Sequence, residues 1–218
     1  MKNKLKNTLI ILYICVAILS FVVILLIPAT REWFKMMSKN HAYVMGFVKF
    51  ALLATAGELI AGIIASKKPT LPPQIILRFI IWGLIGVWIT FMMGVYKIAS
   101  TSLVGNNNLF VMALLTSVLM NTSFGPTFMA VHKITDRILE LLSKKEKITF
   151  NSVVGGINWS KFVSFTILIT VPCFWIPAHT ITFMLPSEYQ VMMAAALSVA
   201  LGVFLSFGSR KKQAQGVK

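Results

Sequence analysis

Long apolar runs separated by short polar stretches dominate the pattern along this chain of 218 residues. Runs of about 18 or more apolar residues predict transmembrane helices, because a helix rises about 1.5 Å per residue across a hydrocarbon core of about 30 Å. Membrane strands would need only about 9–11 residues of alternating polarity. The sequence therefore predicts an all-α fold, a polytopic transmembrane bundle of six helices spanning residues 8–27, 43–65, 75–98, 109–132, 162–183 and 189–207.

Turn-forming and charged residues separate the predicted spans. Proline- and lysine-rich residues 67–73 follow the second span, a Gly-Asn-Asn-Asn turn at 105–108 follows the third, and Pro-Ser-Glu at 186–188 follows the fifth. Residues 133–161 begin with an amphipathic pattern, so we expect a cytoplasmic helical extension and a loop there. We expect the whole chain, 1–218, to form a single membrane domain.

The first span has a second interpretation as a secretory signal peptide, because Lys2, Lys4 and Lys6 precede it. Its apolar stretch is longer than the about 7–15 residues of a signal sequence, and no clear cleavage site follows. We therefore expect a retained helix. Cleavage would leave five spans and place the mature N-terminus outside.

Composition and charge support a membrane location. Only 12% of residues are charged, against about 25% in soluble domains, and 57% are hydrophobic. With six spans, both termini lie on the same side of the membrane, and 16 of the 21 lysines and arginines lie on that side. The positive-inside rule then predicts an N-in, C-in protein of the cytoplasmic membrane of a bacterium, with the lipid bilayer as its partner. Nucleic acid is not expected, since no basic face with aromatic or polar readers is present.

The sequence offers no constellation for catalysis, metal binding or a cofactor. Cys15 and Cys173 lie in apolar runs, and no zinc or iron–sulfur spacing occurs. Haem ligation by His132 and His179 together is disfavoured, because they fall on opposite sides of the predicted membrane. With no paired carboxylates, Ser/His/Asp grouping or phosphate-binding loop, we predict no enzyme and no cofactor.

Glu58 and Arg78 are the first candidates for a site, because charged groups at membrane depth need partners. A short loop joins their helices, so the two should pack antiparallel and bring the side chains within reach. An ion pair that anchors this helix hairpin is one interpretation. A Glu58 that lines a solute path and a protonated Glu58 that faces the bundle are the alternatives.

Asn121 lies near the middle of the fourth predicted span. Ala113, Ser117, Asn121 and Gly125 recur every four residues and so share one helix face. Small and weakly polar residues on one face favour close helix packing with an interhelical hydrogen bond. A pore-lining stripe is the second interpretation.

The fifth predicted span contains Pro172 and Pro177, each of which removes a backbone donor, and we expect them to break the helix. The freed carbonyls would need hydroxyl partners or a wet cavity. Trp175 lies one turn before His179. A satisfied histidine at the membrane interface is one interpretation of His179, and a functional group is the other.

Two stripes of small residues predict close packing within the chain or a homo-oligomer. The stripes are Gly57, Ala61 and Ala65 in the second span, and Ala194, Ser198 and Gly202 in the sixth.

From about residue 57 onward the order of these features resembles the Mpv/PMP family of peroxisomal and mitochondrial inner-membrane proteins. Gly57-Glu58 is similar to the family's Gly-Asp, and Phe124-Gly125-Pro126 to its Phe-Ala-Pro. The C-terminal pattern is matched by Trp175, Pro177, His179, Thr182-Phe183, Pro186, Gln190 and Leu205-Ser206, although the family has Arg where Gln190 stands. The resemblance implies a distant, bacterial relative with a weakly selective pore or solute-flux role.

Three functions remain after the sequence alone. The first is a channel or facilitator for small solutes, and the second is a non-transporting structural or assembly bundle. A membrane enzyme or redox subunit is the third. A wet cavity that reaches Glu58 and Asn121 would favour the channel, whereas internal hydrogen bonding of both residues would favour the assembly bundle.

Overall fold

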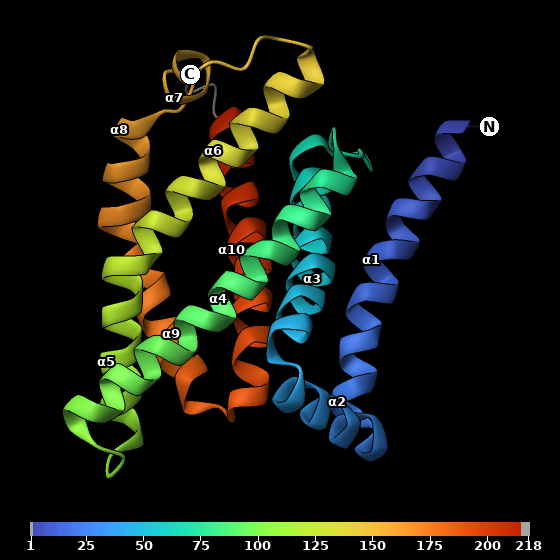
Figure 1. Ribbon diagram of the computed structural model, residues 1–218. Coiled ribbons are helices and arrows are strands. Elements are labelled where there is room, and N and C mark those ends of the chain that lie inside the picture. Colours follow the sequence, from blue (N-terminus) through green and yellow to red (C-terminus); the bar gives the residue numbers. More distant parts are fainter. Residues whose placement is uncertain (1, 215–218) are drawn as a thin grey trace. The chain divides into compact units, whose positions relative to one another are not determined.

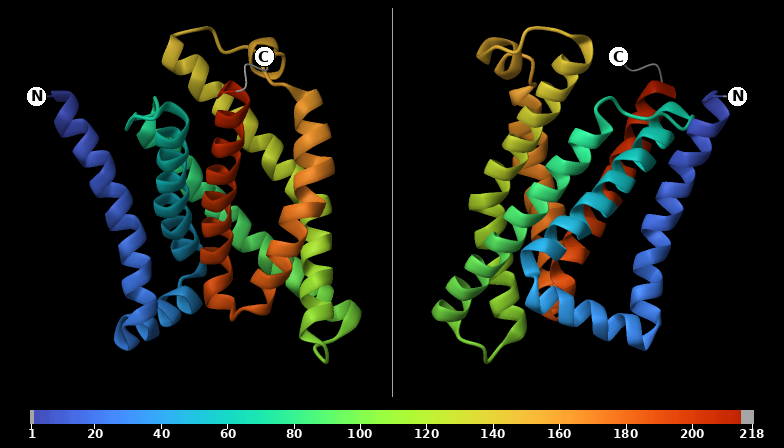
Figure 2. Two further views of the ribbon diagram at one scale, coloured as in Figure 1. Left: turned by 180° about the vertical axis from the view of Figure 1, so that it is seen from behind. Right: turned by 45° about the vertical axis from the view of Figure 1, so that its right-hand side comes forward.

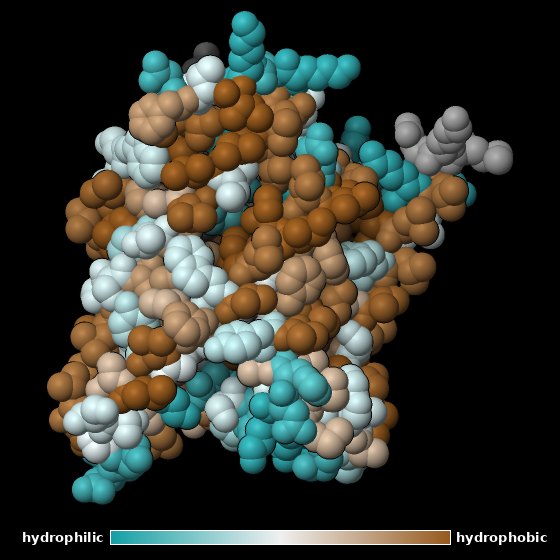
Figure 3. Space-filling model, viewed as in Figure 1, coloured by the Kyte–Doolittle hydropathy of each residue, from teal (hydrophilic) through white to brown (hydrophobic). Residues whose placement is uncertain are grey.

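The computed structural model describes residues 2–214, with side chains from Lys4 to Phe204. The described residues are 88% helical and contain no strand. Hydrophobic residues make up much of the surface drawn in Figure 3. The prediction of an all-α membrane fold is confirmed, because six helices are long and apolar enough to cross a membrane: Lys4–Leu26, Ala42–Ser66, Ile75–Val104, Leu109–Lys144, Trp159–Met184 and Ser187–Phe204.

The chain divides into two compact units, residues 1–88 with 191–218 and residues 89–190. The first unit contains α1 (Lys2–Leu26), α2 (Pro28–Asn40), α3 (Ala42–Ser66), the first half of α4 (Ile75–Val104) and most of α10 (Ser187–Ala214). The second contains the rest of α4, α5 (Leu109–Leu119), η1 (Met120–Phe124), α6 (Gly125–Lys144), α7 (Phe150–Val154), α8 (Trp159–Lys161), η2 (Phe162–Trp175) and α9 (Ile176–Met184) (Figure 1). Here η marks a π-helical segment.

Helix α2 was not among the predicted elements. It crosses between the ends of α1 and α3 (Figures 1 and 2). Its Phe34 and Ser38 are buried, and Trp33 on its other face is half exposed. Glu32 accepts a hydrogen bond from Lys35 at 2.8 Å, which lowers the pKa of the Glu32 carboxyl. A helix that buries Phe34 and carries the charged Glu32 and Lys35 outside that buried face is typical of one that lies along a membrane interface.

Helices α3 and α4 approach closely at two glycines. A Cβ atom placed on Gly86 of α4 would collide with the backbone carbonyl of Gly46 on α3. Backbone cannot yield as a flexible side chain does, so this crossing requires glycine at position 86. The contact fixes the helix hairpin that carries Glu58 and Arg78.

In the second unit, α5 packs along α9, and both adjoin π-helical segments. The helix after η1 continues as α6 to Lys144 and ends at Lys145, whose φ of 57° is left-handed. Leu139 and Leu141 of α6 are buried. The loop that follows carries α7, capped by reciprocal hydrogen bonds between Thr149 and Ser152.

Candidate functional site

The first polar cluster, Glu58, Arg78 and Trp82, lies within the first unit. Arg78 Nη1 lies 2.5 Å from Glu58 Oε1, and Trp82 Nε1 donates to Glu58 Oε2 at 3.2 Å. Arg78 Nε also donates to the carbonyl of Pro73 in the α3–α4 loop, at 3.1 Å. The Glu58–Arg78 ion pair expected from the short loop is formed. We call this group the Glu58 cluster.

Burial strengthens the Glu58 cluster. The side chains of Glu58 and Arg78 are 25% and 13% exposed, so water screens their attraction less than at an open surface. Arg78 and Trp82 lie one turn apart on α4 and reach the two oxygens of the same carboxylate. The charge of Glu58 is therefore matched by a cation and a neutral donor.

The second cluster, which we call the Asn121 cluster, joins α5 and η1 to α9 in the second unit. Asn121 Nδ2 donates to the Ser117 carbonyl at 2.8 Å and lies 3.2 Å from Ser117 Oγ. Ser117 Oγ donates to the Ile176 carbonyl at 2.7 Å. His179 Nδ1 lies 3.0 Å from Asn121 Oδ1, which returns the chain of hydrogen bonds to α9.

These contacts indicate which ring nitrogen of His179 carries a hydrogen. The Ser117 carbonyl can only accept, so the amide nitrogen of Asn121 must face it and the amide oxygen must face His179. His179 Nδ1 then carries a hydrogen and donates to Asn121 Oδ1. A neutral His179 with the Nδ1–H tautomer therefore satisfies the cluster.

The Asn121 cluster is buried and flanked by aromatic rings. Ser117 is 0%, Asn121 2% and His179 7% exposed. The His179 ring lies 5.2 Å from that of Trp175 and 6.4 Å from that of Phe183. His179 is buried under α5 and hydrogen-bonded, as expected for a satisfied histidine, and its place near the membrane interface stays a prediction.

The pairing of Asn121 with His179 was missed by sequence reasoning. Each residue was recognised as a polar interruption of its own span. Asn121 and His179 are 58 residues apart in the sequence, and hydropathy does not indicate which spans pack against each other. The sequence did show one polar group in each of two apolar helices, and a polar group in the membrane needs a partner.

The prolines do not break the fifth span, contrary to expectation. Helix η2 stays continuous through Pro172 by adopting π-helical geometry, and Pro177 follows where η2 passes without a break into α9. Each proline lacks a backbone donor, and the π-helical segment absorbs this irregularity in the backbone ladder. Pro126 likewise stands where η1 passes into α6. These positions keep the helices intact beside the Asn121 cluster.

The two small-residue stripes face each other within the first unit. A Cβ on Gly57 would lie 2.6 Å from a Val199 methyl, and one on Gly202 would lie 3.8 Å from Ala61 Cβ. Ala194 is buried, whereas Ala65 is exposed. The stripes thus bring α3 and α10 together inside the chain.

Both clusters consist of groups that hold helices together by hydrogen bonds and an ion pair. Among the described residues, no three His, Cys, Asp or Glu side chains gather in a group suited to a metal ion. Ser117, Asn121 and His179 form a chain of hydrogen bonds that begins and ends on α9. The arrangement is suited to fixing helix positions.

No family model, curated protein or solved structure matches this chain. Six apolar helices define its class as a helical membrane protein. The resemblance to the Mpv/PMP family stays a prediction from the residues that suggested it.

Proposed function

We propose that this chain is a non-conducting membrane bundle with a structural or assembly role, packing against itself or against other membrane proteins. One observation carries this proposal: the strongest candidates for lining a solute path, Glu58 and Asn121, are both engaged by hydrogen bonds within their own units. A group that binds a passing solute must exchange its partners for that solute. Here the partners are fixed protein groups.

The energetics favour the same conclusion. Freeing Asn121 for a solute would leave the buried His179 Nδ1–H without an acceptor, at a cost of about 1–3 kcal/mol. Freeing Glu58 would separate it from Arg78 in a site where the two side chains are mostly buried. Both clusters therefore resist opening.

An assembly role needs a surface, and the lipid-facing helices supply one. The small-residue stripes are used between α3 and α10, so we assign association to exposed apolar faces instead. Helix α1 shows the most open face, with Leu12, Val16 and Leu19 each more than half exposed. Helix pairing there would rest on van der Waals packing, since lipid tails are as apolar as leucine.

We also propose that both termini face the cytoplasm of a bacterial cell. The excess of lysine and arginine on the terminal side of the predicted spans supports this orientation. A tag at either end should be labelled by a membrane-impermeant reagent only after the cells are opened. Labelling of intact cells would reverse the orientation.

The competing function is a small-solute channel, which the resemblance to the Mpv/PMP family implies through Gly57-Glu58 and Phe124-Gly125-Pro126. Flux decides between the two. Proteoliposomes that contain the wild-type chain, the Asn121→Leu variant or no protein are loaded with ions and uncharged solutes of increasing size. We expect equal leakage from all three. Wild-type flux above that of empty vesicles, altered by Asn121→Leu, would replace the assembly proposal with a channel.

Self-association is measured in the same vesicles. A Cys15→Ser, Cys173→Ser background with Ser143→Cys, an exposed position on α6, gives a single label that keeps the α1 face free. If copies associate, energy transfer between donor-labelled and acceptor-labelled chains should persist as lipid is added. Transfer that falls to the value of random mixing would exclude self-association and leave partners of other kinds.

A further inference from the structure

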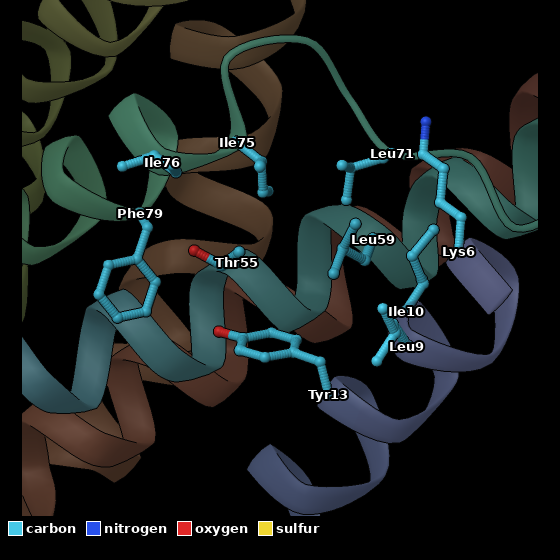
Figure 4. Close-up of a pocket in the computed structure, with 10 residues that line it drawn as sticks. All are labelled: Lys6, Leu9, Ile10, Tyr13, Thr55, Leu59, Leu71, Ile75, Ile76 and Phe79. Atoms are coloured by element: carbon cyan, nitrogen blue, oxygen red, sulfur yellow. The ribbon is translucent and has the colours of Figure 1, made fainter. Parts of the chain in front are cut away.

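The first unit contains an apolar pocket of about 380 Å³ between α1, α3 and the start of α4 (Figure 4). This volume lies within the range of about 300–1,000 Å³ typical of small-molecule sites. Its walls are aliphatic and aromatic, and include Ile10, Leu59 and Phe79. Apolar walls of this kind suit a hydrocarbon chain.

Thr55 lies in the wall of this pocket and is only 2% exposed. Its hydroxyl and that of Tyr13 point toward one another (Figure 4). Tyr13 also donates to the Leu52 carbonyl at 3.1 Å. The two hydroxyls of the wall are therefore turned toward protein groups, and the surface left to an occupant is apolar.

The rim of the pocket is positively charged. Lys6 lines it from α1, and Leu71 lines it from the α3–α4 loop, which also carries the exposed Lys67 and Lys68. Among the described residues, no aspartate or glutamate lines the pocket. Lys6 stands near the start of the span Lys4–Leu26, at the depth where lipid headgroups lie.

We propose that this pocket binds one anionic phospholipid from the bilayer. An acyl chain fills the space between α1, α3 and α4, passing Thr55, and the phosphate lies beside Lys6. Charge complementarity selects the occupant, because a cationic rim above an apolar cavity matches an anionic head above a hydrocarbon tail. The site does not depend on the assembly role, since a conducting bundle would hold the same lipid.

Lipid binding to the purified full chain tests the proposal. The probes are phosphatidylglycerol and phosphatidylcholine with identical acyl chains, and native mass spectrometry counts the bound molecules. We expect one phosphatidylglycerol to bind more tightly than phosphatidylcholine. Lys6→Gln should weaken phosphatidylglycerol binding about fivefold, as expected for the loss of one lysine near a lipid surface. The matched control is Lys4→Gln, on the same helix but outside the pocket, which should change binding less than about twofold.

A second pair of variants tests the chain position. Thr55→Leu should lower the affinity for both lipids, because the larger side chain fills the cavity. Ile76→Trp narrows the pocket from an exposed position and serves if Thr55→Leu misfolds. Equal effects of Lys6→Gln and Lys4→Gln would overturn the proposal, because they would indicate general surface attraction. Unchanged phosphatidylglycerol binding in the folded cavity variants would overturn it as well.

Discussion

Replacing Asn121 by leucine tests whether the Asn121 cluster fastens two helices together. The substitution keeps a side chain of similar size but removes the acceptor of His179 Nδ1–H and the donor to Ser117. The stranded His179 donor, buried at 7% exposure, should lower the free energy of unfolding by about 1–3 kcal/mol.

The interhelical part of this loss can be isolated by a double-mutant cycle. Asn121→Leu, His179→Phe and the double variant are unfolded by denaturant titration in mixed micelles. We expect a coupling energy of about 0.6 kcal/mol and at most about 1.7 kcal/mol, the range found for hydrogen bonds between membrane helices. The matched control is Thr122→Val, whose exposed hydroxyl bonds only to the Val118 and Leu119 carbonyls of its own helix, and which should change stability by less than about 0.5 kcal/mol. Strictly additive single effects would refute the reasoning.

Three further predictions concern the first unit. Glu58→Gln should lower folded yield and reduce the free energy of unfolding by about 1–3 kcal/mol, since Arg78 loses its counter-charge; wild-type stability would contradict a structural ion pair. Gly86→Ala should destabilise the chain by about 1–3 kcal/mol, because the new methyl meets backbone. On the same helix, Gly94→Ala meets no described atom within 4 Å and should be neutral or slightly stabilising in the same titration; equal losses would argue against the close crossing. Lys49→Met should speed hydrogen exchange in α2, because the Lys49 ammonium bonds Ser38 at 2.8 Å and lies 4.4 Å from the centre of the Phe34 ring; unchanged exchange there would show that other contacts anchor α2.

The spans and the Glu58–Arg78 pair could be predicted because they depend on local information. Apolar length alone identifies a helix that crosses a membrane. The short segment between α3 and α4 makes these helices antiparallel neighbours, so a charge on each at similar depth must lie close. Sequence separation of 20 residues limits the possible geometries.

Helix α2 and the partner of Asn121 could not be predicted in this way. The 13 residues of α2 are too polar and too few to be recognised as a span, and their stability comes from packing of Phe34 and Ser38. The Asn121–His179 hydrogen bond depends on which helices become neighbours, and hydropathy carries no such information. Helix η2 also continues through Pro172 because its backbone is π-helical, and the residue pattern did not predict this π-helical geometry.

Access of water to Ser117 is the most direct measure of whether the polar groups of the second unit are sealed within protein. Ser117→Cys, made with Cys15 and Cys173 both replaced by serine, places a thiol at a position that is 0% exposed. A small, water-soluble thiol reagent is added to proteoliposomes on both sides, with the exposed Ser143→Cys as the reactive control. A sealed bundle predicts that position 117 reacts only after unfolding. Reaction at a rate close to that of position 143 in the folded protein would reveal a wet path and contradict the account.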